Sequence, residues 1–173
     1  WRPGLCRGFI FRCVALPSSA RGVWLFAGSA LALGGLTWVS CSSLGLFVNS
    51  VHLWRLELFF AFMVIHLWGK FWMAAWRGNR DLTWITGVVL FVSSIGTAFT
   101  GYLSQTNFDG QWIAAEAKDG LDAVGIGAYF NVLNPGQMLL WHVVLLPFVV
   151  GFLTVVHVVL VRRPGVVPPL AAE

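Results

Sequence analysis

Four histidines are the residues of this 173-residue chain whose type and spacing could do chemistry. His52 and His66 are 14 residues apart in one apolar run, and His142 and His157 are 15 residues apart in another. On an α-helix, at roughly 100° per residue, 14 steps return to within about 40° of the starting face and 15 steps to within about 60°. Partners on one helix would be separated by about 21–22 Å along its axis. Two such helices side by side would present two His–His pairs at two depths.

Paired imidazoles suit two metal centres that each take two axial nitrogen ligands. Neutral imidazole is a good ligand for haem iron, so we expect two non-covalent b-type haems. Zinc is disfavoured, because each pair offers two nitrogens and no nearby carboxylate or thiolate. A proton relay would need acidic groups deep in the membrane, where Glu57 is the one candidate. With both axial positions filled, the expected chemistry is one-electron transfer along the membrane normal, with a lipid-soluble quinol or quinone as the redox partner.

The composition predicts an all-α membrane protein. The chain is 58% hydrophobic and 10% charged, with a mean hydropathy of +0.78, whereas a soluble domain carries about 25% charge. Continuous apolar runs, rather than period-two alternation, favour helices over a closed barrel. The formal net charge is +4, but the basic residues cluster in short loops, where they set topology and do not indicate nucleic-acid binding. The three cysteines form no Cys-x-x-Cys-His motif, so nothing indicates covalent haem attachment.

A four-helix transmembrane bundle should position the histidines. A basic segment, residues 1–22, would precede a membrane domain over residues 23–163, and a Pro-rich tail would follow over residues 164–173. The last span contains Pro147, which is expected to kink it. Residues 104–136 form a long polar connection, with aromatic residues suited to short interfacial helices. The four expected spans are roughly residues 23–48, 51–76, 82–103 and 137–161.

Two glycines of the third expected span repeat the spacing of the histidines. Gly87 and Gly101 are 14 residues apart and would leave clearings at two depths, where two flat haem faces could lie. The charge distribution gives an orientation, because basic residues mark cytoplasmic loops. Both termini should therefore be cytoplasmic and the long connection outside. His52 and His142 would then form an outer pair, and His66 and His157 an inner pair.

The chain resembles the N-terminal domain of cytochrome b from bc1 and b6f complexes, well over about residues 48–169 and loosely over the first expected span. The similar segments are Leu82-Thr-Trp-Ile-Thr-Gly87, Phe99-Thr-Gly-Tyr102 and His142…Leu146-Pro147…His157…Val161-Arg-Arg…Gly165. The spacings of 14 and 15 are closer to the b6 type. The resemblance implies a low-potential haem on the outer pair and a high-potential haem on the inner pair. It departs at Asn49 and Gly69, where the family usually has arginine, and after Tyr102, where the family continues with Pro-Trp.

We assign eight residues to cofactor binding and leave the catalytic residues unassigned. They are His52, His66, His142, His157, Gly87, Gly101, Trp84 and Lys70. Lys70, Arg55 or Arg77 would meet the haem propionates in place of the missing arginines.

The expected role is that of the redox subunit of a quinol–cytochrome c reductase-like respiratory complex. This complex would lie in a bacterial cytoplasmic membrane and include an iron–sulfur protein, a cytochrome c subunit or both. A separate subunit would supply the later helices, and the complex would be a homodimer. Two alternatives remain open: a dihaem membrane anchor that links another dehydrogenase to the quinone pool, and a non-catalytic structural subunit.

Overall fold

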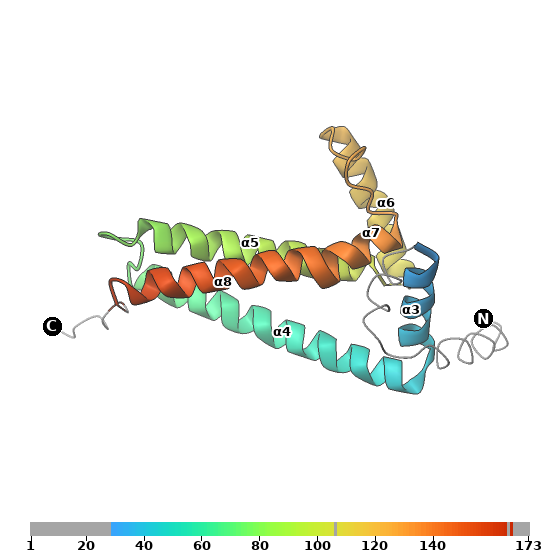
Figure 1. Cartoon of the computed structure of the whole chain (residues 1–173), viewed down its shortest axis with the longest axis horizontal. Helices are drawn as coiled ribbons and strands as arrows, with labels where there is room; N and C mark the ends of the chain where they lie inside the picture. Colours follow the sequence, from blue (N-terminus) through green and yellow to red (C-terminus); the bar gives the residue numbers. More distant parts are fainter. Residues whose placement is uncertain (1–28, 106, 166, 168–173) are drawn as a thin grey trace.

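Three long apolar helices form the body of the protein in a computed structural model that describes residues 29–105, 107–165 and 167 (Figure 1). They are α4 (Ser43–Trp72), α5 (Asp81–Leu103) and a continuous helix made of α7 (Pro135–Leu140), the π-helical turn η1 (Trp141–Leu145) and α8 (Leu146–Arg162). Each is long and apolar enough to cross a membrane. The shortest has 23 residues, which at about 1.5 Å per residue exceeds the ~30 Å hydrocarbon core.

The chain direction alternates so that α4 and α8 run the same way, with α5 antiparallel to both (Figure 1). Helices α5 and α8 pack along their lengths, whereas α4 meets α5 over a smaller area and diverges from it. Two shorter helices lie at the end where α4 begins. Helix α3 (Ser29–Cys41) packs across this end on α4 and α7, and α6 (Phe108–Ala123) projects away from the three long helices.

The corner between α3 and α4 overturns the expected end of the first span. We expected that span to continue to Val48, with a linker near Asn49 and Ser50, but these residues lie inside α4. The break is at Ser42, whose hydroxyl accepts a hydrogen bond from the Gly45 N–H at 2.9 Å and caps α4. A Cβ on Gly45 would stand 2.6 Å from the Val39 Cα, so the corner requires glycine.

The expected four-span bundle is therefore only partly reproduced among the described residues. The described part of α3, Ser29–Cys41, has 13 residues, which corresponds to ~20 Å and is shorter than the hydrocarbon core. The described residues thus contain three candidate spans. The expected residues 1–22 and most of the tail, residues 164–173, lie outside the part that the structure describes.

The other end of α4 also differs from expectation. The helix ends at Trp72, whereas we expected it to continue to Trp76. The chain turns there through Ala74 and Gly78, which have φ angles of 50° and 72°. Arg80 then donates hydrogen bonds to the main-chain oxygens of Gly165, at 2.6 Å, and Pro164. These bonds tie the α4–α5 turn to the end of α8.

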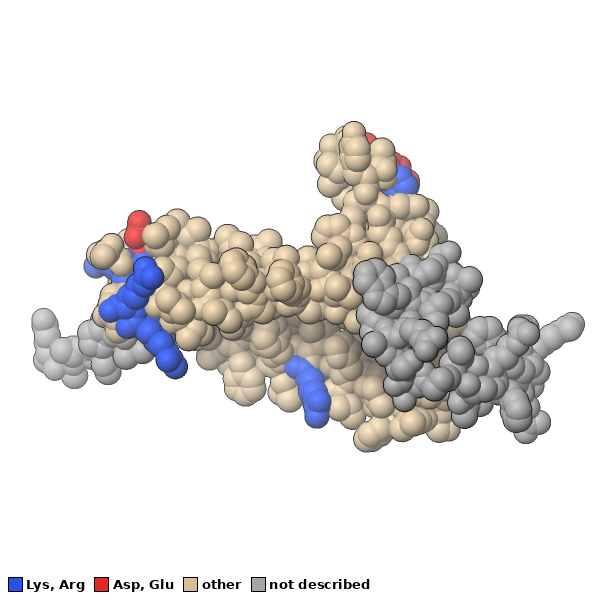
Figure 2. Space-filling view, viewed as in Figure 1, with Lys and Arg blue, Asp and Glu red and all other residues tan. Residues whose placement is uncertain are grey.

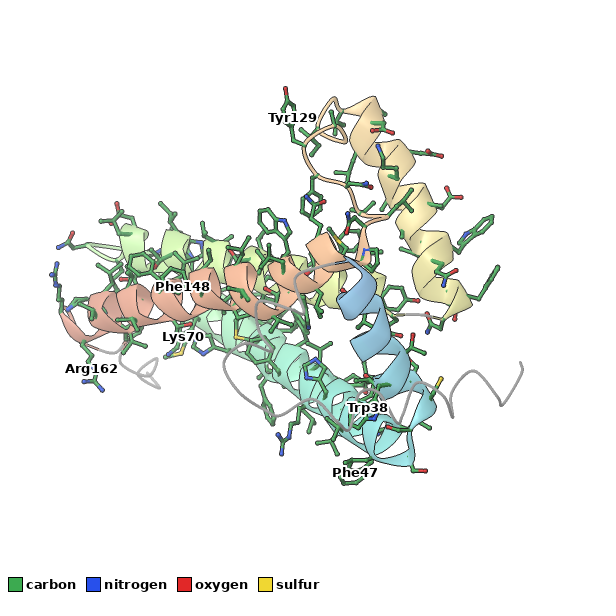
Figure 3. All side chains as sticks on the ribbon, turned by 45° about the vertical axis from the view of Figure 1, so that its right-hand side comes forward. Trp38, Phe47, Lys70, Tyr129, Phe148 and Arg162 are labelled. Atoms are coloured by element: carbon green, nitrogen blue, oxygen red, sulfur yellow. The ribbon has the colours of Figure 1, made fainter. Side chains whose placement is uncertain are left out.

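Charged side chains concentrate at the ends of the molecule. Figure 2 shows lysine and arginine side chains at the end where α4 and α8 finish, and acidic side chains on α6 at the opposite end. Figure 3 places Arg162 at the first of these ends, Lys70 near the end of α4, and Tyr129 at the tip of the part that projects away from the long helices. Between the ends, large apolar side chains such as Phe148 point away from the bundle, as expected for a surface in contact with lipid.

The third long helix contains a wide turn in place of the simple kink expected at Pro147. The Leu146 N–H donates to the Trp141 main-chain oxygen, five residues back, instead of four. Pro147 then lies in the first turn of α8, where a missing N–H costs little. Pro147 thus lies where a new α-helical segment begins, directly after the π turn.

A small apolar core fixes the end at which α5, α6 and α7 meet. Its buried residues are Leu103, Ala114, Val132 and Met138. The long connection that we expected to hold short interfacial helices contains α6, of 16 residues, and a loop. Asparagine side chains cap α6 and α7, because Asn107 and Asn134 accept hydrogen bonds from the N–H groups of Gly110 and Gln137.

Candidate functional site

Two of the predicted ligands, His52 on α4 and His142 in the π turn, face each other. Their ring centroids are 6.1 Å apart and their planes cross at 84°. Two imidazoles that bind one metal ion from opposite sides place their centroids about 6 Å apart, because each metal–nitrogen bond is about 2 Å long and each centroid lies about 1 Å behind its nitrogen. The separation in the protein therefore suits two axial ligands of one metal.

A main-chain hydrogen bond fixes the tautomer of His142. Its Nδ1 lies 2.7 Å from the main-chain oxygen of Thr97 on α5. A carbonyl oxygen only accepts hydrogen bonds, so Nδ1 must carry the proton. The Nε2 lone pair is then free to bind a metal, in the arrangement that metal-binding histidines commonly show.

A threonine hydroxyl does the same for His157 on α8. Nδ1 of His157 lies 3.1 Å from the Thr86 Oγ1. That hydroxyl already donates its proton to the main-chain oxygens of Leu82 and Thr83, at 2.9 and 3.0 Å. With that proton on a main-chain oxygen, the hydroxyl can only accept from His157, and in this arrangement Nδ1 carries the proton and Nε2 is free. Both histidines of the third long helix are thus oriented by partners on α5.

The remaining predicted ligand, His66, is exposed on α4, near enough to His157 for their charges to interact. His52 thus lies opposite His142, and His66 lies within electrostatic range of His157. Among the described residues, no three His, Cys, Asp or Glu side chains form a metal-binding group. Each pair therefore offers two nitrogens, as a haem with two axial histidines requires.

The two predicted glycines lie against the two histidines of the third long helix. A Cβ on Gly101 would stand 2.8 Å from Nδ1 of His142, and one on Gly87 would stand 3.0 Å from Cε1 of His157. By contrast, a Cβ on Gly96 would meet no atom of the described residues within 4 Å. The two glycines spaced by 14 residues are therefore the ones that leave room for the imidazole rings.

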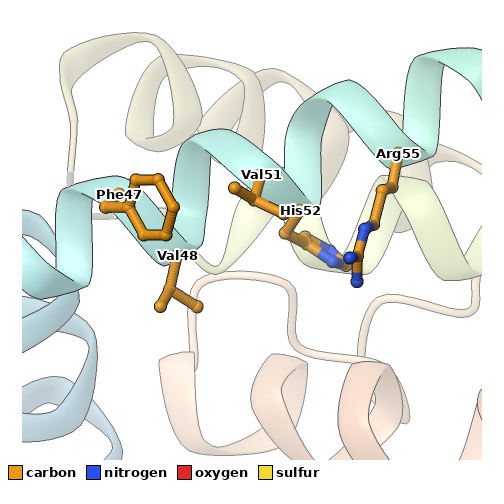
Figure 4. A pocket seen from close by; sticks show the side chains of 5 residues that line it. All are labelled: Phe47, Val48, Val51, His52 and Arg55. Atoms are coloured by element: carbon orange, nitrogen blue, oxygen red, sulfur yellow. The ribbon is translucent and has the colours of Figure 1, made fainter.

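Each histidine of α4 has a basic residue one turn further along the helix. Arg55 follows His52 and lines the same pocket, which has a volume of about 340 Å³ and is otherwise apolar (Figure 4). Lys70 follows His66 and lies 4.0 Å from the Met73 sulfur. Of the two basic residues, Arg55 is the one that lines a pocket together with its histidine.

The other predicted residues lie further from the rings. Trp84 packs on Phe71, with centroids 6.3 Å apart, and so joins the end of α4 to the start of α5. Arg77 lies over the ring of Trp76, 5.1 Å from its centroid, in the turn after α4.

The sequence analysis missed the partners that orient the histidines. Thr86 is recognisable in retrospect, because it precedes Gly87 and so lies next to the clearing that receives His157. The Thr97 partner is a main-chain oxygen, which every residue carries, so side-chain chemistry gives no signal for it.

The residues present at the His52–His142 pair fit a b-type haem. The ring separation of His52 and His142 suits axial ligation, and hydrogen bonds leave Nε2 of His142 and His157 free. The glycines provide the space for the rings.

Together, these helices make the chain a multi-pass helical membrane protein with paired histidines. A family model described as cytochrome b(N-terminal)/b6/petB matches residues 57–173. The chain belongs to this cytochrome b N-terminal/b6 family, of which it is a divergent member.

Curated relatives agree with the family match. The chain is 31% identical over 140 residues to the cytochrome b6 of Heliobacterium mobile, covering 73% of this chain and 64% of that protein. It is 31% identical over 137 residues to the cytochrome bc complex cytochrome b subunit of Chlorobaculum thiosulfatiphilum, covering 73% of this chain and 32% of that protein. The cytochrome b6 of Chlamydomonas reinhardtii is 26% identical over 137 residues, with 73% and 64% covered. The chain thus matches less than two thirds of the length of these relatives.

The family match covers three of the four histidines. It begins at residue 57 and so includes His66, His142 and His157, but not His52. The assignment of His52 therefore depends on its position opposite His142.

Proposed function

We propose that this protein carries electrons across a membrane through two bis-histidine b-type haems. The observation that carries the proposal is the pairing of His52 with His142 at a ring separation of 6.1 Å, with Nε2 of His142 left free. His52 and His142 would hold one haem, and His66 and His157 the other. Each haem, when bound, supplies a one-electron carrier whose iron has no open position.

The protein's own groups would prepare both sites before binding. Hydrogen bonds from His142 and His157 to partners on α5 hold the two rings and their tautomers. Gly101 and Gly87 keep the space beside the rings free of side chains. Such preorganisation matters because an orienting partner of a ligating histidine commonly accounts for a 10–100-fold difference in metal affinity or activity.

Arg55 and Lys70 are the side chains that we propose for the haem carboxylates. Side chains on a helix tilt toward its N-terminus, so the Arg55 guanidinium points back toward His52, as Figure 4 shows. Arginine binds carboxylates strongly because its planar group can donate two parallel hydrogen bonds. Replacing Arg55 by leucine should weaken haem retention at the His52–His142 pair, whereas Arg55→Lys should restore part of it, as measured by haem content after detergent purification.

The positive-inside rule supports an orientation for this arrangement. Arg77, Arg80, Arg162 and Arg163 follow α4 or end α8, on the side that we assign to the cytoplasm, and the acidic α6 lies on the other side. His52 and His142 would then form the outer site, and His66 and His157 the inner site. A fourth span would have to include residues before Ser29, and both termini would be cytoplasmic.

The partners follow from the electron-transfer role and from the relatives. We propose a quinol as the donor and a quinone as an acceptor, and a respiratory complex in a bacterial cytoplasmic membrane. Iron–sulfur and cytochrome c subunits would complete the complex, a separate subunit would supply the later helices of the longer relatives, and the complex would be dimeric. One matched relative is named as the cytochrome b subunit of a cytochrome bc complex, which supports this proposal.

Electron transfer across sealed vesicles tests the function. The purified chain is reconstituted into liposomes that enclose ferricyanide, and a membrane-impermeant reductant is added outside. Ferricyanide should be reduced in vesicles with the unaltered chain, and this should stop in vesicles with His52→Ala or His66→Ala, because each variant would lose one haem of the relay. Equal rates for the unaltered chain and both variants would contradict the proposal.

A further inference from the structure

The π turn at Trp141–Leu145 explains how two helices with different histidine spacings can present matching pairs. His52 and His66 are 14 residues apart, but His142 and His157 are 15 apart. In regular α-helices the two pairs would be rotated by about −40° and +60°, a mismatch of about 100°. The mismatch equals the rotation of one residue, and the third long helix contains a turn with one residue more than an α-helical turn, since the Leu146 N–H bonds to Trp141 five residues back.

We infer that the π turn is the element that sets the rotational register of His142 toward His157. It begins one residue before His142 and ends at Leu145, so most of it lies between the two histidines. A π turn takes up the extra residue without rotating the helix on either side, so the 15 residues of sequence cover the rotation of about 14 α-helical residues. The two pairs then have the same angular offset.

A repeat of 14 residues has a further consequence for helix packing. It equals two heptads, and residues at heptad spacing drift by ~20° per heptad on a straight helix, which a left-handed supercoil compensates. The two histidines of α4 and the two glycines of α5 both have this spacing. In the third long helix the sequence spacing is 15, and the π turn restores the rotation that a spacing of 14 would give. All three long helices then present their site residues in the same register.

Pro147 is the residue that favours the wide turn. In a continuous α-helix its ring would clash with the carbonyl of Val143, and one hydrogen bond would be lost. With the π turn directly before it, Pro147 lies in the first turn of α8. The π turn therefore takes up the extra residue and also places Pro147 where its missing N–H costs no helical hydrogen bond.

Two single-residue deletions distinguish the rotation of His142 relative to His157 from the number of residues that separate them. This test rests on the proposed haems. Val144 lies in the π turn and Val149 in α8, and each exposes 41% of its surface. Deleting either reduces the separation of His142 and His157 from 15 positions to 14. Without Val144 the helix can become regular, so two haems per chain should remain. Without Val149 the π turn stays, His142 rotates by about 100°, and the chain should lose the haem of the His52–His142 pair but keep the other.

Two further measurements keep the outcome decisive. Deletion of Val144 combined with Pro147→Ala removes the kink that the proline would otherwise introduce, and should also retain two haems.

A readout without haem uses His52→Cys with His142→Cys in a chain whose other cysteines are serine. A short bis-maleimide should cross-link this chain, and its Val144-deleted form, but not its Val149-deleted form. Equal behaviour of the two deletions in both assays would overturn the inference, whereas absence of haem from the unaltered chain, with the cross-linking pattern intact, would contradict only the proposed function.

Discussion

The hydrogen bond from His157 to Thr86 shows how a single side chain on α5 could tune a ligand on α8. An acceptor on Nδ1 makes an imidazole a stronger electron donor, and a stronger donor stabilises the oxidised state of a bound metal. The bond at His142 also involves Nδ1 but uses a main-chain oxygen. The two sites therefore differ in whether a substitution can remove the orienting partner.

Thr86→Val should raise the midpoint potential of the haem at the His66–His157 pair. The loss of one hydrogen bond, at ~0.5–1.5 kcal/mol, corresponds to roughly 20–60 mV for one electron. Thr97→Val is the matched control, because His142 bonds the main-chain oxygen of that residue and not its hydroxyl. A spectroscopic redox titration measures both variants. The assignment would be wrong if Thr97→Val shifted its haem as much as Thr86→Val shifted the other.

The glycines beside the rings give a second prediction at this scale. Gly101→Ala should displace His142, because the new Cβ would stand 2.8 Å from its Nδ1, and should lower occupancy of the His52–His142 site several-fold. Gly96→Ala should leave both haems in place, because its Cβ would meet none of the described atoms within 4 Å. Haem content per chain distinguishes the two variants. Similar losses in both would mean that helix packing in general, and not contact with the ring, makes α5 sensitive.

At the scale of the elements, hydropathy predicts the long helices but not where the first of them begins. The apolar runs of α5 and α8 are close to the expected bounds, because lipid-spanning helices need about 20 apolar residues. The α3–α4 corner was missed because the apolar pattern continues through it. Its signals are Ser42, a favourable N-cap, and Gly45, which permits close approach of Val39. Both residues can be read in the sequence, but serine and glycine inside an apolar run are weak evidence for a helix boundary.

The histidine pairing was predictable from spacing, whereas the π turn was not. Pro147 predicts a local disturbance of the helix, but a kink and a π turn are both compatible with a proline. The extra residue in the spacing of 15 is the additional signal. It becomes interpretable only when compared with the spacing of 14 on α4, because register is a property of two helices together.

Gly45→Ala tests the corner between α3 and α4. Its Cβ would stand 2.6 Å from both Cα and O of Val39, which are main-chain atoms that can move little. Overpacking of this kind costs about 1–3 kcal/mol, so the variant should unfold at a lower temperature in detergent. Gly69→Ala, also on α4, should unfold like the unaltered chain, because its Cβ would meet no described atom within 4 Å. An unchanged melting temperature for Gly45→Ala would contradict the tight corner.

At the scale of the whole molecule, the arrangement of charges and helices predicts which end faces the cytoplasm. The turn after α4 and the end of α8 are basic and joined through Arg80, whereas α6 is acidic and projects from the other end. Basic loops are retained on the cytoplasmic side. The proposed membrane orientation can therefore be predicted from the sequence, while the close approach of the two basic segments required the structure.

Labelling of introduced cysteines tests this orientation. Asn79→Cys, in the turn after α4, and Asp119→Cys, on α6, both replace exposed residues. In intact cells a membrane-impermeant maleimide should label the cysteine at residue 119 and not the one at residue 79, and permeabilised cells should allow both. The reverse pattern would exchange the outer and inner sites.

The most direct test of the central claim is the number of haems bound by the purified chain. Pyridine haemochrome quantification should give two b-type haems per chain, and the reduced-minus-oxidised spectrum should titrate as two one-electron components. His142→Ala should remove one haem and leave the component assigned to His66 and His157. A purified, folded chain that binds no haem, or a His142→Ala variant that still binds two, would contradict the account.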